Sequence, residues 1–266
     1  MLLALDTSAA VSVALLDHGR VLASRHAYDP RKHAELLSPF VQEVLGQAGV
    51  GLDEVDTIAV GQGPGPFTGL RVGLVTARVL AYANELVLHG LISLDGLAEG
   101  AATRLPPGDF ELIAATDARR REVYWARYLV RPGRQPERVD GPHVGPASGI
   151  EVGAAVCVGR GTLLYPEHLP PAVSVEALAE LDLLDPTAAD IGVVANRELA
   201  DPAVAGLDGP RDPQPAYLRR PDVTEPVSPA AATPALRPNA TGTAETQPAG
   251  STGSGAADRS GTPSRP

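Results

Sequence analysis

Short apolar runs and polar turns alternate along the first thirty residues in a pattern that is typical of a β-sheet. Residues 2–5 are apolar and end at Asp6-Thr7-Ser8, and residues 11–16 and 21–27 predict two further strands. The glycine and polar residues at 17–20 predict a turn between these two strands. Because the connections are short, we predict an antiparallel meander that begins at the N-terminus.

Two helices of different character are predicted next. Apolar residues fall on one face over residues 33–48, which predicts an amphipathic helix with a kink at Pro39 or an irregular first turn. Residues 72–83 are apolar at nearly every position, which is typical of a helix covered on more than one side. Small side chains recur every four residues in this second helix, at Gly73, Ala77 and Ala81. They favour close packing, either with the first helix or with another subunit.

A glycine- and proline-rich loop precedes the second helix and is the most distinctive stretch of the chain. It occupies residues 60–71, after an apolar strand at 56–60, and is predicted to be a strand-to-helix turn. A P-loop needs Gly-Lys-Ser/Thr at its end, and the only lysine is Lys32. The dinucleotide pattern Gly-x-Gly-x-x-Gly also fails in both registers. The loop either holds a ligand or fixes the start of the helix; we take the latter as the first interpretation and phosphate contact at Gly63 or Gly65 as the second.

The remaining pattern predicts a second, smaller α/β domain followed by a disordered tail. A strand at 85–89 and a helix at 94–103 complete the first domain, residues 1–106. The second domain, residues 107–220, is predicted to contain strands at 112–116, 123–129 and 154–158 and helices at 175–181 and 187–199. Residues 221–266 are rich in Pro, Ala, Thr, Ser and Gly, and cannot bury enough apolar surface to offset their ordering entropy.

Composition excludes several classes of protein. The chain has 266 residues, an apolar fraction of 44%, one cysteine and a net charge of -10. The charge argues against nucleic-acid binding through a basic surface, and the arginine cluster that begins at Arg119-Arg120-Arg121 is interpreted as a solvated rim of a hairpin. No apolar run approaches the roughly 18 residues of a membrane span, and a basic leader is absent at the start. We therefore expect a cytoplasmic protein.

Few residues have the character of a catalytic site. Asp6, Thr7 and Ser8 follow the first strand, where a carboxylate and hydroxyl groups could hold a metal-bound phosphate, although the same residue types are common in turns. His33 is followed one helical turn later by Leu37, so a metal site is not expected there. The apolar surroundings of Cys157 in the sequence indicate a structural role.

Four segments together resemble the TsaB family, also called YeaZ, over roughly residues 1–220. These segments are Leu2-Leu3-Ala4-Leu5-Asp6-Thr7-Ser8, Arg31-Lys32-His33-Ala34-Glu35-Leu36-Leu37, Gly63-Pro64-Gly65-Pro66-Phe67-Thr68-Gly69-Leu70-Arg71, and Asp117-Ala118-Arg119 with Glu122-Val123-Tyr124. Pro66 departs from the family, which has Ser at this position. The resemblance implies the α/β fold of actin, sugar kinases and chaperone ATPases (ASKHA), with two related domains and a reduced second one. It also implies a role in the N6-threonylcarbamoyl modification of adenosine 37 in tRNAs that read codons beginning with A.

The resemblance further implies a non-catalytic scaffold or activating partner of the paralogue TsaD, in a complex with the ATPase TsaE. ATP and metal are then expected on those subunits and no cofactor in this chain. The tRNA would be reached indirectly through the complex, with a homodimer as an alternative when TsaD is absent and no association with membranes. The implied interface is a bundle of the first two helices, and the residues predicted there are Leu36, Leu37, Phe40, Val41, Gly73, Ala77 and Ala81. A remnant of a nucleotide site is predicted at Asp6, Thr7, Ser8, Gly63 and Gly65.

Two other classes of protein are weighed against this interpretation. A small-molecule kinase of the same fold would use Asp6 with ATP and magnesium, but the roughly 110 residues between Pro106 and Tyr217 are few for its second domain. A metalloprotease would need a pair of metal ligands that the helical pattern around His33 does not supply.

Overall fold

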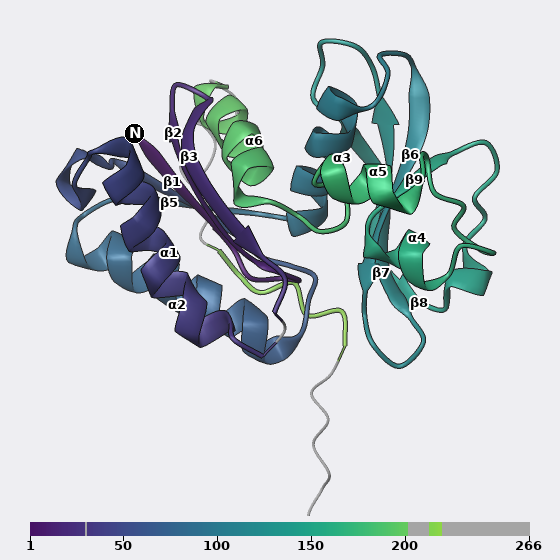
Figure 1. Ribbon diagram of the computed structural model, residues 1–266, viewed down its shortest axis with the longest axis horizontal. Coiled ribbons are helices and arrows are strands. Elements are labelled where there is room, and N and C mark those ends of the chain that lie inside the picture. Colours follow the sequence, from purple (N-terminus) through teal and green to yellow (C-terminus); the bar gives the residue numbers. More distant parts are fainter. Residues whose placement is uncertain (30, 202–212, 220–266) are drawn as a thin grey trace, which may run out of the picture. The chain divides into compact units, whose positions relative to one another are not determined.

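The structure is a computed structural model that describes residues 1–29, 31–201 and 213–219 (Figure 1). These residues belong to one unit, Met1–Asp222, which contains two β-sheets with helices packed on them. The α/β class predicted from the sequence is confirmed by this arrangement. The predicted disordered tail, residues 221–266, lies outside the described residues.

The first sheet has five strands in the order β3-β2-β1-β4-β5. The strands are β1 (Leu2–Asp6), β2 (Val11–Asp17), β3 (Arg20–Ala27), β4 (Thr57–Gly61) and β5 (Val87–Leu91). The first three form the predicted antiparallel meander, and β1, β4 and β5 run parallel. The parallel half brings the ends of β1 and β4 together at one edge, which is where both distinctive loops of the sequence begin.

Helices cover both faces of the first sheet (Figure 1). Leu3 and Leu5 of β1 face α1 (His33–Ala48) and α2 (Phe67–Ala83), whereas Leu2 and Ala4 face α6 (Ala188–Ala200). Successive side chains of a strand point to opposite faces, so a strand covered on both sides is apolar throughout. This explains why all five residues of β1 are buried.

The second sheet has four strands in the order β8-β7-β6-β9. They are β6 (Phe110–Asp117), β7 (Val123–Val130), β8 (Glu137–Gly145) and β9 (Val156–Val158), with α3 (Ser93–Arg104) and α5 (Val175–Glu180) contributing to the core on one face. Short elements complete the fold, namely α4 (Arg160–Leu164) and the 3-10 turns η1 (Leu52–Glu54) and η2 (Ala147–Gly149). Strand β8, helix α4 and the two 3-10 turns were not predicted from the sequence.

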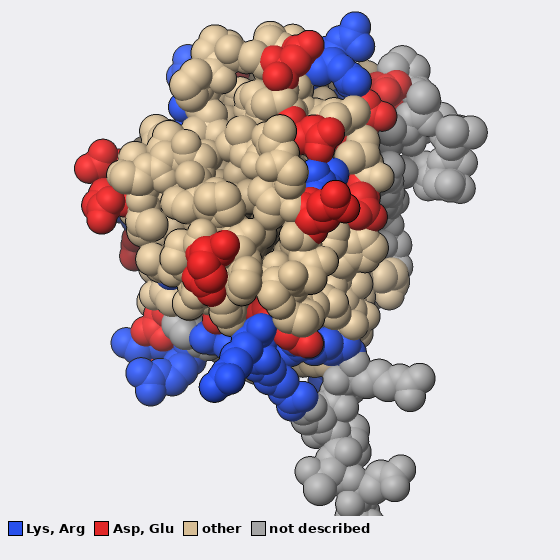
Figure 2. Space-filling model, turned by 90° about the vertical axis from the view of Figure 1, so that its right-hand side faces the viewer, with Lys and Arg blue, Asp and Glu red and all other residues tan. Residues whose placement is uncertain are grey.

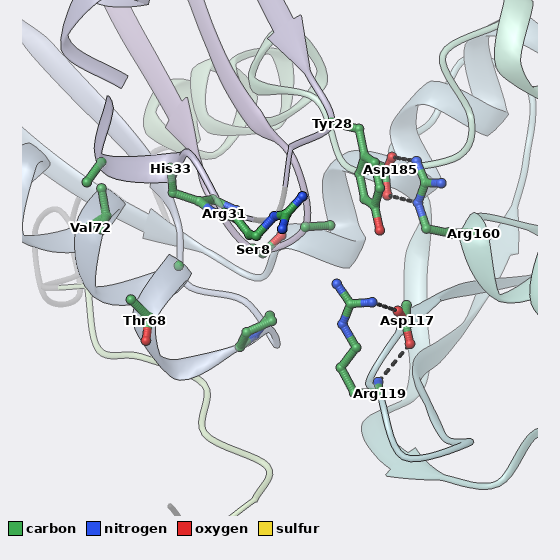
Figure 3. A pocket seen from close by; sticks show the side chains of 14 residues that line it. Ser8, Tyr28, Arg31, His33, Thr68, Val72, Asp117, Arg119, Arg160 and Asp185 are labelled. Carbon is green, nitrogen blue, oxygen red and sulfur yellow. Dashed lines mark hydrogen bonds and ion pairs between the residues drawn. The ribbon is translucent and has the colours of Figure 1, made fainter. Parts of the chain in front are cut away.

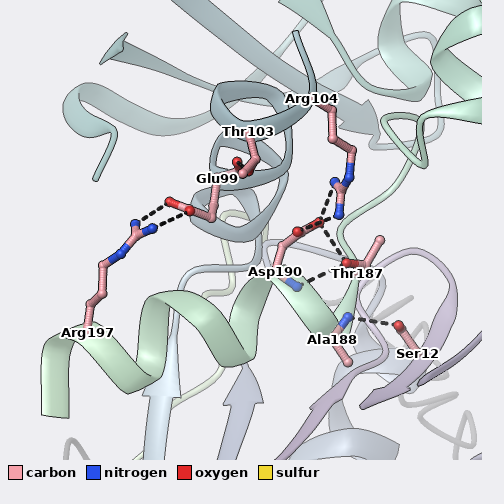
Figure 4. A network of polar contacts seen from close by, with 8 residues as sticks. All are labelled: Ser12, Glu99, Thr103, Arg104, Thr187, Ala188, Asp190 and Arg197. Atoms are coloured by element: carbon pink, nitrogen blue, oxygen red, sulfur yellow. Dashed lines mark hydrogen bonds and ion pairs between the residues drawn. The ribbon is translucent and has the colours of Figure 1, made fainter. Parts of the chain in front are cut away.

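Helix α6 packs on the first sheet and also on α3, which belongs to the core of the second sheet. Two double ion pairs join the helices: Arg197 with Glu99, at 2.6 and 2.7 Å, and Arg104 with Asp190, at 2.9 and 2.7 Å (Figure 4). Thr187 caps α6 by accepting a hydrogen bond from the Asp190 amide. The predicted boundary at residue 106 would assign α6 to the second domain. The domain limits stay a prediction, but the return of this helix to the first sheet was not anticipated.

The described C-terminal residues 213–219 lie along the start of α2 and the loop before it. The Tyr217 ring stacks on Phe67 with 4.2 Å between centroids, and its hydroxyl accepts a hydrogen bond from Arg71 Nε at 3.0 Å. The Ala216 amide donates to the Gln62 carbonyl at 2.8 Å. Two residues after Tyr217, Arg219 donates to the Ala118 carbonyl in the turn between β6 and β7. This segment therefore contacts residues that belong to both sheets.

Candidate functional site

The residues after β1 and the loop after β4 pack directly on each other. Asp6 Oδ1 accepts hydrogen bonds from the Ser8 amide at 2.9 Å and the Ser8 hydroxyl at 2.7 Å. Asp6 Oδ2 accepts one from the hydroxyl of Ser93, at the start of α3, at 2.5 Å. The same hydroxyl accepts a bond from the Gly63 amide at 3.0 Å. The hydrogen bonds of Asp6 and Ser93 therefore connect three segments that are distant in sequence: the end of β1, the loop after β4 and the start of α3.

Burial determines the electrostatics of Asp6. The side chain is fully buried, and burial raises the pKa of its carboxyl to about 6, although the hydrogen bonds from Ser93 and Ser8 lower it. The kinase alternative needs this carboxylate to hold a metal-bound phosphate. In the structure, both of its oxygens are occupied by hydrogen bonds from the chain itself.

Thr7 connects the same corner to α2. Its hydroxyl donates to the Gly69 carbonyl at 2.7 Å and accepts from the Gly73 amide at 3.1 Å. A Cβ atom at Gly73 would lie 2.4 Å from Thr7 Oγ1, and one at Gly65 would lie 2.4 Å from the Ser8 carbonyl oxygen. Such distances are shorter than a van der Waals contact, so these glycines allow the two backbones to approach each other.

The predicted nucleotide-site residues Asp6, Thr7, Ser8, Gly63 and Gly65 are therefore brought together, as their positions after two neighbouring strands suggested. The contacts described for them are contacts with one another and with the two helices. Nucleotide binding by these residues stays a prediction. Their contacts hold the start of α2 against the end of β1, in line with the first interpretation of the glycine-rich loop.

A cavity of about 320 Å³ lies next to this corner (Figure 3). Ser8 is the one predicted nucleotide-site residue on its wall. The other lining residues come from the segment between β3 and α1, the starts of α1 and α2, the end of β6 with the turn after it, the start of α4 and the loop before α6; they include Tyr28, Arg31, His33, Thr68, Asp117, Arg119, Arg160 and Asp185. Arg119 pairs with Asp117 at 2.9 Å, and Arg160 Nε donates to Asp185 at 2.9 Å. The cavity wall is thus much richer in charge than the corner beside it.

The residues predicted to contact a partner are mostly buried inside this chain. Leu37, Val41, Gly73, Ala77 and Ala81 belong to its own buried interior, while Leu36 and Phe40 are partly buried against the same core. The small side chains of α2 face Thr7 and the first sheet, so the strip does not form an exposed surface for another helix. Packing of the strip within the chain was one of the two alternatives left open by the sequence, and the location of the interface on α1 and α2 stays a prediction.

The exposed apolar surface of α2 lies elsewhere on the helix, at Val75, Val79 and Tyr82. These side chains are 56%, 59% and 91% exposed, respectively. They are spaced four and three residues apart and therefore lie on one face. Sequence reasoning missed them because the helix is apolar nearly all round, although this spacing was present in the sequence.

The arginine cluster occupies the turn between β6 and β7. Arg119, Arg120 and Arg121 are exposed and have φ angles of 61, 54 and 62°, which place three consecutive non-glycine residues in the left-handed region. Figure 2 shows basic side chains gathered at the lower end of the face turned to the viewer, in a chain whose net charge is -10. Farther along the two strands, Arg127 and Arg131 pair with acidic side chains.

Two other sequence expectations concern Cys157 and metal ligands. Cys157 is buried in β9, and burial raises the pKa of its thiol to about 11, in agreement with a structural role. His33 lies at the start of α1 with Leu37 one turn later in the core. Across residues 1–29, 31–201 and 213–219, no three His, Cys, Asp or Glu side chains are grouped as metal ligands. No helix within these ranges is long and apolar enough to cross a bilayer.

Comparisons with known proteins agree with this architecture. A family model described as TsaD, tRNA N6-adenosine threonylcarbamoyltransferase, matches residues 26–140. The tRNA threonylcarbamoyladenosine biosynthesis protein TsaB of Escherichia coli is 33% identical over 225 residues, which cover 82% of this chain and 94% of the relative. An uncharacterized protein of Mycobacterium tuberculosis is 38% identical over 203 residues, covering 76% and 82% of the two chains.

A solved structure shares the fold as well as the sequence. It is an uncharacterized protein from Pseudomonas aeruginosa with similarity to the peptidase YeaZ, 35% identical, with a TM-score of 0.67. The match covers 82% of this chain and 99% of that one. The two helix-covered sheets are an ASKHA-type α/β fold, as predicted. The extent of the match to the Escherichia coli relative then identifies the chain as a member of the TsaB (YeaZ) family.

Proposed function

We propose that this chain is a non-catalytic subunit in the biosynthesis of N6-threonylcarbamoyladenosine at position 37 of tRNAs that read codons beginning with A. The observation that carries the proposal is the 33% identity to the Escherichia coli TsaB protein over 94% of that protein's length. The match of residues 26–140 to the TsaD family model supports a kinship with the transferase that such a subunit would accompany. The chain would act in the cytoplasm and reach tRNA through its partners.

The contacts of Asp6 support a scaffold rather than a kinase. A kinase of this fold would use this carboxylate to hold the metal and phosphate, whereas here its oxygens accept hydrogen bonds from Ser8 and Ser93. Freeing the carboxylate would require the Gly63 backbone to move as well, since the Ser93 hydroxyl also holds the Gly63 amide. ATP and metal then belong to the partner subunits TsaD and TsaE.

The exposed face of α2 is the surface we propose for TsaD. Val75, Val79 and Tyr82 form an apolar row on a 17-residue helix, and an apolar face of this kind favours packing against a helix of a partner. Helix α1 lies beside α2 on the same face of the first sheet and would contribute its exposed edge. A second copy of the chain would occupy this face when TsaD is absent.

The experiment is reconstitution of tRNA modification from threonine, bicarbonate and ATP, with the enzymes of the pathway and with, without or with a variant of this chain. Val79→Asp should reduce modification and TsaD binding by at least about tenfold, because it places a charge in an apolar interface. Leu163→Asp, at an exposed apolar position of α4, is the matched control and should leave both unchanged.

The two parts of the proposal fail in different ways. Modification that proceeds equally without the chain would overturn the function. Modification that requires the chain but tolerates Val79→Asp would overturn only the assigned surface. Ala77→Asp is unsuitable as a probe, because Ala77 is 0% exposed. A charge there would disrupt the packing of α2 on the first sheet and destabilise the fold.

A further inference from the structure

The apolar row on the exposed face of α2 has a charged residue at its start. Arg71 is exposed and lies four residues before Val75, so their side chains are neighbours on one face of the helix. Val79 and Tyr82 continue this row. The surface that we propose for TsaD therefore consists of one arginine followed by three large apolar side chains.

The side chain of Arg71 is held in place by two aromatic rings and one hydrogen bond. Its Nε donates to the Tyr217 hydroxyl at 3.0 Å. Its guanidinium carbon lies 5.7 Å from the centre of the Phe67 ring and 5.9 Å from the centre of the Tyr217 ring. The two rings stack on each other, so they form one aromatic support. These contacts restrict the rotamer freedom of the arginine before any partner arrives, which lowers the entropic cost of binding.

The terminal nitrogens of this guanidinium are available for a partner. Among the described residues, none accepts a hydrogen bond from Arg71 Nη1 or Nη2, and none forms an ion pair with it. Arg78, the next arginine of α2, differs in this respect because it donates to the Pro213 carbonyl. An exposed guanidinium that is oriented through Nε and unpaired at its other nitrogens can offer two parallel N–H groups. This geometry matches a carboxylate.

We propose that Arg71 binds the carboxylate of an aspartate or glutamate of TsaD, next to the apolar row of α2. Arg71 can have this role only within the proposed function, on which the inference rests. Arginine and aromatic residues are enriched at the centres of protein interfaces, where surrounding apolar contacts exclude water. A phosphodiester of RNA offers no apolar surface to Val75 and Val79, so the row favours a protein carboxylate. Phe67 and Tyr217 are then positioning residues for Arg71.

The first test is calorimetric titration of the full chain with TsaD at low and at moderate ionic strength. Arg71→Gln should weaken binding about tenfold, the loss expected for one charge-assisted pair, and should reduce the salt dependence of the affinity. Arg134→Gln is the matched control, because Arg134 is an exposed arginine in the turn before β8 of the second sheet. It should change the affinity less than about twofold.

A double-mutant cycle tests whether the aromatic support acts through Arg71. Tyr217→Phe keeps the stacked ring and removes the hydroxyl that orients Arg71 Nε. It should weaken TsaD binding about threefold in the wild type and have no effect when Arg71→Gln is already present. An equal effect of Tyr217→Phe in both backgrounds would overturn the positioning role, because Tyr217 would then contact the partner independently of Arg71.

A crosslink identifies the chemical class of the partner group. Lys32 is the only lysine of the chain, so Arg71→Lys places an amine at a position that mass spectrometry can assign without ambiguity. A carbodiimide joins amines to carboxylates that are in contact with them. A crosslink from position 71 to an aspartate or glutamate of TsaD supports the proposal. Arg134→Lys is the control and should give no crosslink to TsaD.

The outcomes separate the role of Arg71 from the proposed function. Loss of TsaD binding in Val79→Asp, with unchanged binding in Arg71→Gln and no crosslink from position 71, would overturn the role of Arg71 and leave the function of the chain intact. Equal loss in Arg71→Gln and Arg134→Gln would also overturn it, because the effect would then be one of net charge. Absence of TsaD binding by the wild type would overturn the proposed partner together with the role of Arg71.

Discussion

Asp6 is an acidic residue whose environment within the fold makes stability depend on pH. Burial makes its ionised form unfavourable and raises its pKa from 3.8 to about 6. A carboxyl that is protonated more readily in the folded than in the unfolded state contributes stability that is fully present below pH 3.8. That contribution is lost as the pH rises through about 6.

Asp6→Asn removes this dependence while keeping the size of the side chain. The free energy of unfolding of the wild type, minus that of the variant, should fall by about 3 kcal/mol between pH 3.8 and pH 7. Urea denaturation at a series of pH values measures this difference, in which the contributions of other titrating groups cancel. A difference that stays constant over the interval would show that Asp6 has an ordinary pKa in the folded chain.

The sequence revealed part of this residue's environment. Ser8 is two residues from Asp6, and a short side chain that bonds a nearby amide is a local turn pattern. Ser93 is 87 residues away and reaches Asp6 only because β1, β4 and β5 lie side by side. The contact between Asp6 and Ser8 was therefore predictable as a turn, whereas the contact between Asp6 and Ser93 depends on the order of strands in the sheet.

Helix α2 shows the corresponding limit for an element. It was predicted at 72–83 and is found at Phe67–Ala83, so its end was correct and its start five residues too late, while its small-residue strip was recognised. The surface that the strip faces was not recognised, because a helix that is apolar nearly all round has no polar side to show which face is exposed. Strand β8 was missed for the opposite reason. It is an edge strand, mostly exposed, with Pro142 in it, and such strands lack the alternating pattern of a half-buried sheet.

Gly73→Ala and Gly46→Ala test how closely α2 approaches the strand end. Alanine normally stabilises a helix relative to glycine, and at Gly46 of α1, where a Cβ meets nothing within 4 Å, the variant should gain about 0.5–1 kcal/mol. At Gly73 the new Cβ would lie 2.4 Å from Thr7 Oγ1. The variant should therefore lose about 1–3 kcal/mol of unfolding free energy, measured by urea denaturation.

Adding Thr7→Ala separates the steric effect from helix propensity. In this background the hydroxyl is absent, so Gly73→Ala should cost less than in the wild type, with a favourable coupling between the two positions. Stabilisation by Gly73→Ala of the size expected at Gly46 would show that α2 does not approach Thr7 closely.

At the scale of the whole molecule, two segments that follow the second sheet return to the first. Helix α6 was predicted at 187–199 and found at Ala188–Ala200, but its packing on β1 and β2 was not foreseen. Residues 213–219 return in the same way to the start of α2. Periodicity indicates which side of a segment is buried but not which sheet covers it, so the position of α6 along the chain did not reveal its packing on the first sheet.

The C-terminal segment couples the start of α2 to the β6–β7 turn, because Tyr217 stacks on Phe67 while Arg219 bonds the Ala118 carbonyl and pairs with Glu122. Tyr217→Ala should lower the unfolding free energy by about 1–2 kcal/mol and speed amide exchange at Glu122. Tyr217→Phe keeps the ring, loses only the bond from Arg71, and should leave exchange there nearly unchanged. Hydrogen exchange and urea denaturation measure both effects; lower stability with unchanged exchange at Glu122 would mean that the two ends of the segment are held independently.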